Sequence, residues 1–258
     1  IPLIIVCIIS VLIVIKLLIK KLKISTKMAY LISIGSTVCG TTAIMATAPI
    51  IKANKGEVAY AIANMTVFGI ISMLIYPYFA NIYFNGEPLL VGLFLGTAIH
   101  ETSQVAAAGL IYDQQFNSPE TLNIATVTKL IRNTFLVIMI PLFAYLYNRN
   151  ETKTKNYSIL NIFPYFVLGF IGMIIFRNIG DQLFLTENTQ VIWQNSVLMI
   201  KDSAKVFLSM AMAAVGLSTN LKDLKSMGYK PFIVGFIAMV TVGLVSIISM
   251  KIFTELFL

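Results

Sequence analysis

Two short segments of this chain combine glycine, hydroxyl and ionisable residues within otherwise apolar sequence. The first is Gly-Ser-Thr-Val-Cys-Gly at residues 35–40, and the second is Gly-Thr-Ala-Ile-His-Glu at residues 96–101. Glycine and hydroxyl residues weaken a helix and allow it to break inside a membrane. A helix that restarts after such a break presents backbone N–H groups without intrahelical partners. These groups and the helix dipole together favour an anion.

Residues in and after each break could bind such an anion. Hydroxyl groups can donate to its oxygen atoms, and glycine lets the backbone approach closely. Lys129 and Arg132 stand three residues apart, so they share one helix face and could add positive charge. The candidate substrate-binding residues are Gly35, Ser36, Thr37, Cys39, Gly40, Thr41, Thr42, Gly96, Thr97, His100, Thr102, Ser103, Gln104, Lys129 and Arg132.

His100 and Glu101 lie within the second break and are candidates for coupling binding to a proton or another ion. Structural roles stay open for both, because His100 could be a buried histidine with its bonds satisfied and Glu101 could neutralise Lys129 or Arg132. An ionisable residue near the membrane centre costs about 2.5–3.5 kcal/mol, so each needs a partner or a water-filled cavity. The cysteines and the single histidine make no metal-ligand pattern, and we expect no metal and no cofactor.

The composition predicts that these residues sit in a membrane. The chain has 258 residues, of which 58% are hydrophobic and only 12% charged, and its mean hydropathy is +0.86. A soluble domain typically carries about 25% charged residues. We therefore expect an all-α membrane protein, a polytopic helical bundle with a single transmembrane domain over residues 1–258. Because the sequence opens within an apolar run and without methionine, we expect further N-terminal helices to be missing from it.

Six long apolar segments are predicted to span the membrane, at residues 1–19, 57–78, 121–147, 159–177, 191–217 and 231–257. The segments 28–56 and 89–112 contain the breaks. Lysine and arginine gather after the first, third and fifth spans, whereas the loops 79–87 and 113–120 contain neither. Basic loops stay in the cytoplasm, so this charge pattern favours two re-entrant broken hairpins over two full crossings. It also explains the net charge of +8 without a nucleic-acid partner.

A shift of 61 positions aligns the two breaks with each other. Three aligned pairs are identical, namely Gly35 and Gly96, Thr41 and Thr102, and Ala46 and Ala107. A unit of one hairpin and one span crosses the membrane once, so two such units in tandem must be inverted. Many secondary transporters are built from inverted repeats whose broken helices meet near the midplane. Chance similarity between two segments rich in small residues is the alternative interpretation.

With these motifs in hand, the chain resembles the YeiH family of UPF0324-type membrane proteins, which are proposed sulfate exporters. The matching residues are Gly35–Ile44, Ala48–Ile50, Glu57–Tyr60, Gly96–Gly109, Lys129–Arg132 and Ala211–Leu217. The family pattern usually has serine at the position of Thr42 and aspartate at the position of Glu101. The resemblance implies a multi-pass protein of the bacterial plasma (inner) membrane with a role in anion export.

We expect a secondary transporter that exports or exchanges a small anion, such as sulfate or an organosulfonate, bound near the midplane between the broken helices. Its expected partners are that anion, the lipid bilayer, a coupling proton or Na⁺, and further copies of the chain in a homo-oligomer. A cation- or proton-coupled antiporter using Glu101 and a non-transporting binding or signalling protein are the alternatives. An enzyme acting through Cys39 or His100 is not expected, because no paired carboxylates or metal-ligand spacing accompany them.

Overall fold

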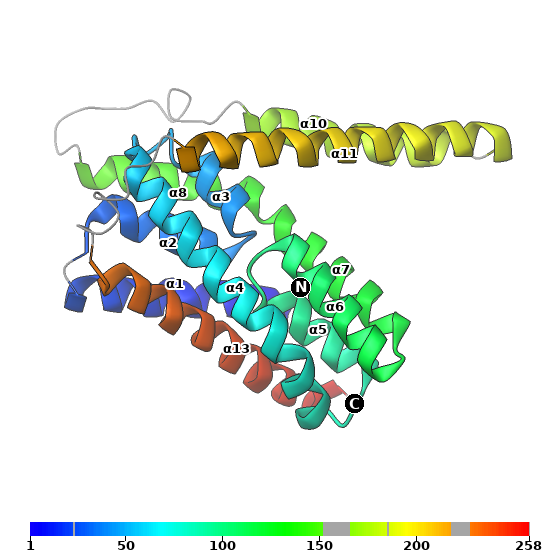
Figure 1. The fold of residues 1–258 in the computed structure, drawn as a ribbon, viewed down its shortest axis with the longest axis horizontal. Helices are drawn as coiled ribbons and strands as arrows, with labels where there is room; N and C mark the ends of the chain where they lie inside the picture. The colour runs from blue at the N-terminus through cyan, green and yellow to red at the C-terminus, as the bar shows by residue number, and fades with distance from the viewer. Residues whose placement is uncertain (23, 152–165, 185, 218–227, 258) are drawn as a thin grey trace.

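The computed structural model describes the chain except for residues 23, 152–165, 185, 218–227 and 258 (Figure 1). Every regular element in the described ranges is a helix. The helices are α1 (Pro2–Leu22), α2 (Thr26–Thr37), α3 (Thr41–Thr47), α4 (Lys55–Tyr83), α5 (Pro88–Ala98), α6 (Thr102–Phe116), α7 (Pro119–Thr134), α8 (Leu136–Glu151), α10 (Phe166–Leu183), α11 (Glu187–Leu217) and α13 (Lys230–Phe257). The first part of the predicted span 159–177 lies outside the described residues.

Three of the described helical segments are long and apolar enough to cross a membrane, at Lys55–Tyr83, Pro119–Tyr147 and Lys230–Ile252. A helix of 29 residues is about 43 Å long, which exceeds the hydrocarbon core of about 30 Å. Large apolar side chains such as Leu74 and Ile248 are more than half exposed on these helices, as contact with lipid requires. The prediction of an all-α membrane protein is confirmed.

The first broken segment folds back on itself between α2 and α3. Hydrogen bonds join Ser25 to Glu57 and Ser36 to Met65, so α2 runs alongside α4 in the same direction. After α3 the chain returns to the start of α2, where the Lys27 ammonium donates to the Lys52 carbonyl at 2.8 Å. We call α2 and α3 the first hairpin, and residues 38–40 its apex. Gly40 has a φ of 67° there, a conformation that favours glycine.

The second broken segment folds back in the same way between α5 and α6. Gly92 faces Ile124 and Gly96 faces Thr128, so α5 runs parallel to α7. Helix α6 runs antiparallel to α7, because Gly109 faces Leu122 whereas Thr102 bonds Asn133. Helices α5 and α6 are therefore antiparallel, and we call them the second hairpin, with residues 99–101 as its apex. The inverted repeat and the proposed domain limits stay predictions.

The remaining helices surround these two hairpins. Helices α1 and α13 lie side by side along one face, and α4 crosses the middle of the bundle (Figure 1). Ile4 and Ile8 of α1 pack with Val38 and Cys39, and so cover the first apex. Helix α13 reaches the second hairpin through a hydrogen bond between Ser246 and Thr97. Helices α10 and α11 lie together at one end of the molecule and extend past the hairpins (Figure 1).

Close packing at Gly92 holds the second hairpin against α7 and generates a first prediction. A Cβ atom at Gly92 would lie 2.6 Å from the Ile124 Cβ and 3.1 Å from the Thr121 carbonyl oxygen. Gly92→Ala should therefore destabilise the protein by about 1–3 kcal/mol through overpacking. Gly169→Ala is the control, because nothing lies within 4 Å of that position and alanine there favours the helix. Thermal unfolding in detergent compares the two, and equal midpoints would contradict this packing.

Candidate functional site

The apexes of the two hairpins meet inside the bundle. The Thr41 hydroxyl donates a hydrogen bond to the Glu101 carboxylate. A Cβ atom at Gly40 would lie 3.5 Å from the Glu101 Cβ, an ordinary van der Waals distance, so the two apexes lie in direct contact. Residues 60 positions apart in the sequence are thereby brought together at the two breaks. The structure thus gathers most of the candidate residues of both segments around one contact.

Lys129 joins the two apexes from α7. Its side chain is fully buried, and its ammonium group donates to the carbonyls of Val38 and Ile99 at 2.9 Å and to that of His100. An ammonium group has three donors, so these three carbonyls use all of them. One carbonyl belongs to the first apex and two to the second. Lys129 therefore ties together two backbone breaks that would otherwise leave buried acceptors unpaired.

Arg132 makes a second set of bonds one helical turn later. Its guanidinium group is fully buried and donates to the carbonyls of Ser36 and Thr97 at 2.5 Å and of Thr37 at 2.9 Å. These carbonyls are in the last turns of α2 and α5. Each helix end carries about half a negative charge, so a cation there is stabilising. Arg132 thus caps two helix C-termini at once.

The described contacts of both cations consequently go to backbone rather than to an open cavity. The sequence predicts that both residues contribute positive charge to substrate binding, and it leaves open a direct pairing with Glu101. Within the described part of the chain, Glu101 forms no ion pair with Lys129 or Arg132. Each cation donates three hydrogen bonds to carbonyls at or just after the helix ends, and these unpaired carbonyls explain the arrangement.

Several of the predicted hydroxyl donors are already used within the protein. The Ser36 hydroxyl donates to the Met65 sulfur, and the Thr37 hydroxyl donates to the Ser33 and Ile34 carbonyls of its own helix. The Thr97 hydroxyl contacts Leu93, Phe94 and Ser246 in the same manner. All three residues precede their breaks and are fully buried. They line the interior behind the apexes, where an anion would have to displace existing bonds.

The residues that follow the breaks have more freedom. Thr42 and Ser103 are exposed, and Glu101 and Thr102 are partly exposed. No side chain caps the start of either following helix, because the N-cap residue of α3 is Gly40 and the Glu101 side chain makes no capping bond to α6. The first intrahelical bond of α6 runs from the Val105 amide to the Glu101 carbonyl, so the three amides before it begin the helix without such a partner.

Three further candidates lie at the margins of this region. His100 is 1% exposed, and both of its ring nitrogens lack a partner among the described residues. Gln104 turns toward α4, where its amide donates to the Thr66 carbonyl at 3.3 Å and its oxygen packs on Gly69. Cys39 is buried in the apolar cluster beneath α1. Of the three, His100 alone has every polar side-chain atom unsatisfied.

Two residues of this region were not among the sequence candidates. Asn133 donates to the Thr102 hydroxyl at 3.0 Å, and Ser246 contacts Thr97 at 2.6 Å. Asn133 follows Arg132 on the same helix, one turn after Lys129, and that spacing could have revealed it. Ser246 is fully buried and lies in the uncharged stretch 231–250, where a serine was a weaker signal. No group of three or more potential metal ligands occurs in the part of the chain that the structure describes.

The fold and the buried breaks define an all-α membrane protein with two helical hairpins that meet at their apexes. The chain belongs to the family described as conserved hypothetical protein 698, which matches residues 1–235. Its relatives carry the name UPF0324 membrane protein, so the resemblance to the YeiH family of this type is confirmed. Membrane localisation follows from these relatives together with the apolar helices.

The relatives are bacterial and longer than this chain. A UPF0324 membrane protein of Fusobacterium nucleatum is 37% identical over 257 residues, which cover 97% of this chain and 74% of that protein. One from Clostridium tetani is 33% identical, with coverage of 88% and 65%. One from Yersinia pestis is 32% identical, with coverage of 80% and 55%. No solved structure matches the chain.

The bonds of Arg132 generate a second prediction. Arg132→Met keeps much of the side-chain volume but leaves three buried carbonyls without their donors. We expect a loss of at least about 3 kcal/mol of stability, because an unpaired buried acceptor costs about 1–3 kcal/mol. Arg177→Met is the control, since its ion pair with Asp181 is partly exposed and is worth about 0–1 kcal/mol. Thermal unfolding tests this expectation, which equal losses in the two variants would contradict.

Proposed function

We propose that this protein is a secondary transporter of a small anion, such as sulfate or an organosulfonate, which binds where the hairpin apexes meet. The observation that carries the proposal is the open N-terminus of α6 beside His100, whose buried ring nitrogens have no described partner. Broken backbone at membrane depth is tolerated where it is buried in protein or lines a water-filled cavity. Broken helices with charged residues at the break are typical of secondary transporters.

Electrostatics at the apexes favours an anion over a cation. Lys129 and Arg132 contribute two positive charges, and Glu101 contributes one negative charge. The C-termini of α2 and α5 add about half a negative charge each, so these groups nearly cancel. The N-terminus of α6 then remains as unmatched positive potential. A small oxyanion would meet its amides and the hydroxyls of Thr42, Thr102 and Ser103.

His100 gives this site a hydrogen-bonding group that the surrounding protein does not use. A neutral imidazole offers one donor and one acceptor, and leaving both unpaired in the interior is costly. Bound substrate, or water that the substrate displaces, would satisfy them. Glu101 forms the apex contact with Thr41 and is partly exposed, which suits a group that exchanges protons during a transport cycle.

The remaining properties follow as parts of the same proposal. We place the protein in the bacterial plasma membrane as a multi-pass transporter, with a proton or Na⁺ as the coupling ion and with a homo-oligomeric assembly. It is proposed to act without enzymatic chemistry and without a nucleic-acid partner. Since the chain covers 55–74% of the three relatives described above, the direction of transport is a property to be measured on the complete protein.

Flux measurements on hydroxyl variants test the anion site. In proteoliposomes, sulfate or ethanesulfonate uptake by the Thr42→Ala/Ser103→Ala double variant should fall at least about tenfold, because one bond to a charged group is worth about 1.5–3 kcal/mol. Ser196→Ala is the matched control, since this exposed serine lies on α11 and bonds only its own helix. Equal flux in the double variant and the control would overturn the site.

Glu101→Gln distinguishes anion transport from the antiporter alternative. Glutamine can still accept the bond from Thr41, but it neither carries a charge nor exchanges a proton. We expect this variant to keep anion binding and exchange while losing the response of uptake to an imposed pH gradient. Cation-dependent charge movement without any anion requirement, abolished by Glu101→Gln, would instead support the antiporter. Anion-induced thermal stabilisation without flux would indicate a binding protein.

A further inference from the structure

A second candidate site lies at the base of the first hairpin, away from the apexes. The structure has a cavity of about 250 Å³ there, formed where α2, α4 and α13 begin. Ser25 at this cavity and Ser36 near the apex are 11 residues apart along α2, which corresponds to about 16 Å. The cavity is therefore separate from the anion site proposed above. It is also smaller than the roughly 300–1,000 Å³ typical of drug-sized ligands, so it suits a small molecule.

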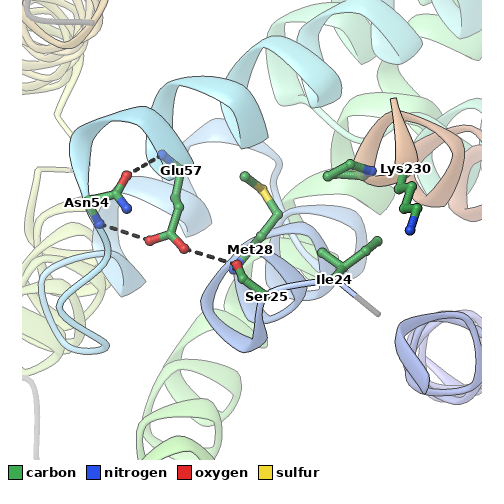
Figure 2. A pocket seen from close by; sticks show the side chains of 7 residues that line it. Ile24, Ser25, Met28, Asn54, Glu57 and Lys230 are labelled. Carbon is green, nitrogen blue, oxygen red and sulfur yellow. Dashed lines mark hydrogen bonds between the residues drawn. The ribbon is translucent and has the colours of Figure 1, made fainter. Parts of the chain in front are cut away.

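A buried carboxylate forms one wall of this cavity. Glu57 is 7% exposed and accepts hydrogen bonds from the Ser25 hydroxyl at 3.0 Å and from the backbone N–H of Asn54 at 3.1 Å (Figure 2). A carboxylate has about four acceptor positions, so these bonds leave part of its capacity free. No cation pairs with Glu57 among the described residues. The positive end of the α4 dipole stabilises this charge in part, and the free acceptor positions leave room for a positive group.

An exposed, positively charged side chain lines the other side of the cavity. Lys230 begins α13 and lines the same cavity, and in Figure 2 it lies across Met28 and Ile24 from Glu57. Within the described part of the chain its ammonium group forms no ion pair. The start of α13 is held beside α4 by bonds from Tyr60 to the Gly228 carbonyl and from Asn64 to the Pro231 carbonyl. The backbone at Lys230 is therefore held beside this cavity.

We propose that this cavity binds a small zwitterion that carries an ammonium group and an acidic group on a short chain. The ammonium group binds Glu57, and the acidic group binds Lys230. The side chains of Ile24, Met28 and Pro231 supply the apolar surface along which the connecting methylene groups lie. This ligand places an ammonium group at the buried Glu57 carboxylate and an acidic group at the exposed Lys230 ammonium, as neither a lone anion nor a lone cation does.

Charge repulsion sets the specificity of this site. A simple carboxylate or sulfonate that approaches Lys230 also approaches the Glu57 carboxylate, and a simple amine that approaches Glu57 also approaches the Lys230 ammonium. Each is disfavoured by the like charge, whereas a zwitterion satisfies both walls. Because Ser25 and Glu57 join the start of α2 to α4, the occupied cavity holds the base of the first hairpin. The ligand therefore acts at a position distinct from the transported anion.

Thermal unfolding and equilibrium binding on the purified protein test this proposal with β-alanine as the probe. Propionate and ethylamine carry its two charges separately and serve as ligand controls. We expect β-alanine to raise the unfolding temperature saturably and the two controls to have no effect. Glu57→Gln and Lys230→Met should each weaken β-alanine binding at least tenfold. Glutamine retains the acceptor that the helix cap of α4 needs, so this variant is expected to fold.

Two control substitutions outside the cavity make the test specific. Lys55→Met removes a lysine close to the cavity that does not line it, and Glu87→Gln removes a carboxylate at the start of α5, beyond the far end of α4. Both should bind β-alanine as the unmodified protein does. The proposal is overturned if β-alanine gives no saturable shift, if propionate or ethylamine gives an equal one, or if the cavity variants bind like these controls. Sulfate flux is measured separately, so its absence leaves this result unaffected.

Discussion

Two fully buried cations determine how this bundle is organised. Lys129 and Arg132 donate six hydrogen bonds to the backbone carbonyls at which α2 and α5 end. Breaking a helix inside a membrane exposes such carbonyls where no water can bind them. The helix ends also carry partial negative charge, which stabilises the cations in return. Buried cations without acceptors and buried carbonyls without donors would each be unfavourable. Bonded to one another, they allow two interrupted helices to meet in the interior.

The contact between the hairpins depends on small residues around those cations. Gly40 supplies the positive φ at which the first apex turns, while Gly92 and Gly96 bring α5 close enough to α7 for Lys129 and Arg132 to reach both breaks. The polar groups after the breaks are left more accessible than those before them. This asymmetry separates a structural side of the apex, formed by carbonyls and cations, from a side with open amides and hydroxyls.

The cavity at the base of the first hairpin follows a different principle. Glu57 caps α4 through Asn54 and accepts a bond from Ser25, so its charge is held by local backbone geometry. Lys230 approaches from a helix more than 170 residues further along the chain. The described bonds of the apex cations all go to backbone carbonyls, whereas the buried Glu57 and the exposed Lys230 line the same cavity without forming an ion pair.

The sequence by itself determined the membrane class, the family and the positions of the helix breaks, because hydropathy and small-residue motifs are local properties. It also singled out Lys129, Arg132, His100 and Glu101, since ionisable residues stand out against apolar sequence. Only the tertiary structure decided that the two cations bond carbonyls, that Ser36, Thr37 and Thr97 are already bonded, and that Asn133 and Ser246 belong to the same region. Those outcomes depend on which helix ends meet in space. Hydrogen-bond partners that are dozens of residues apart have no regular sequence spacing by which they could be predicted.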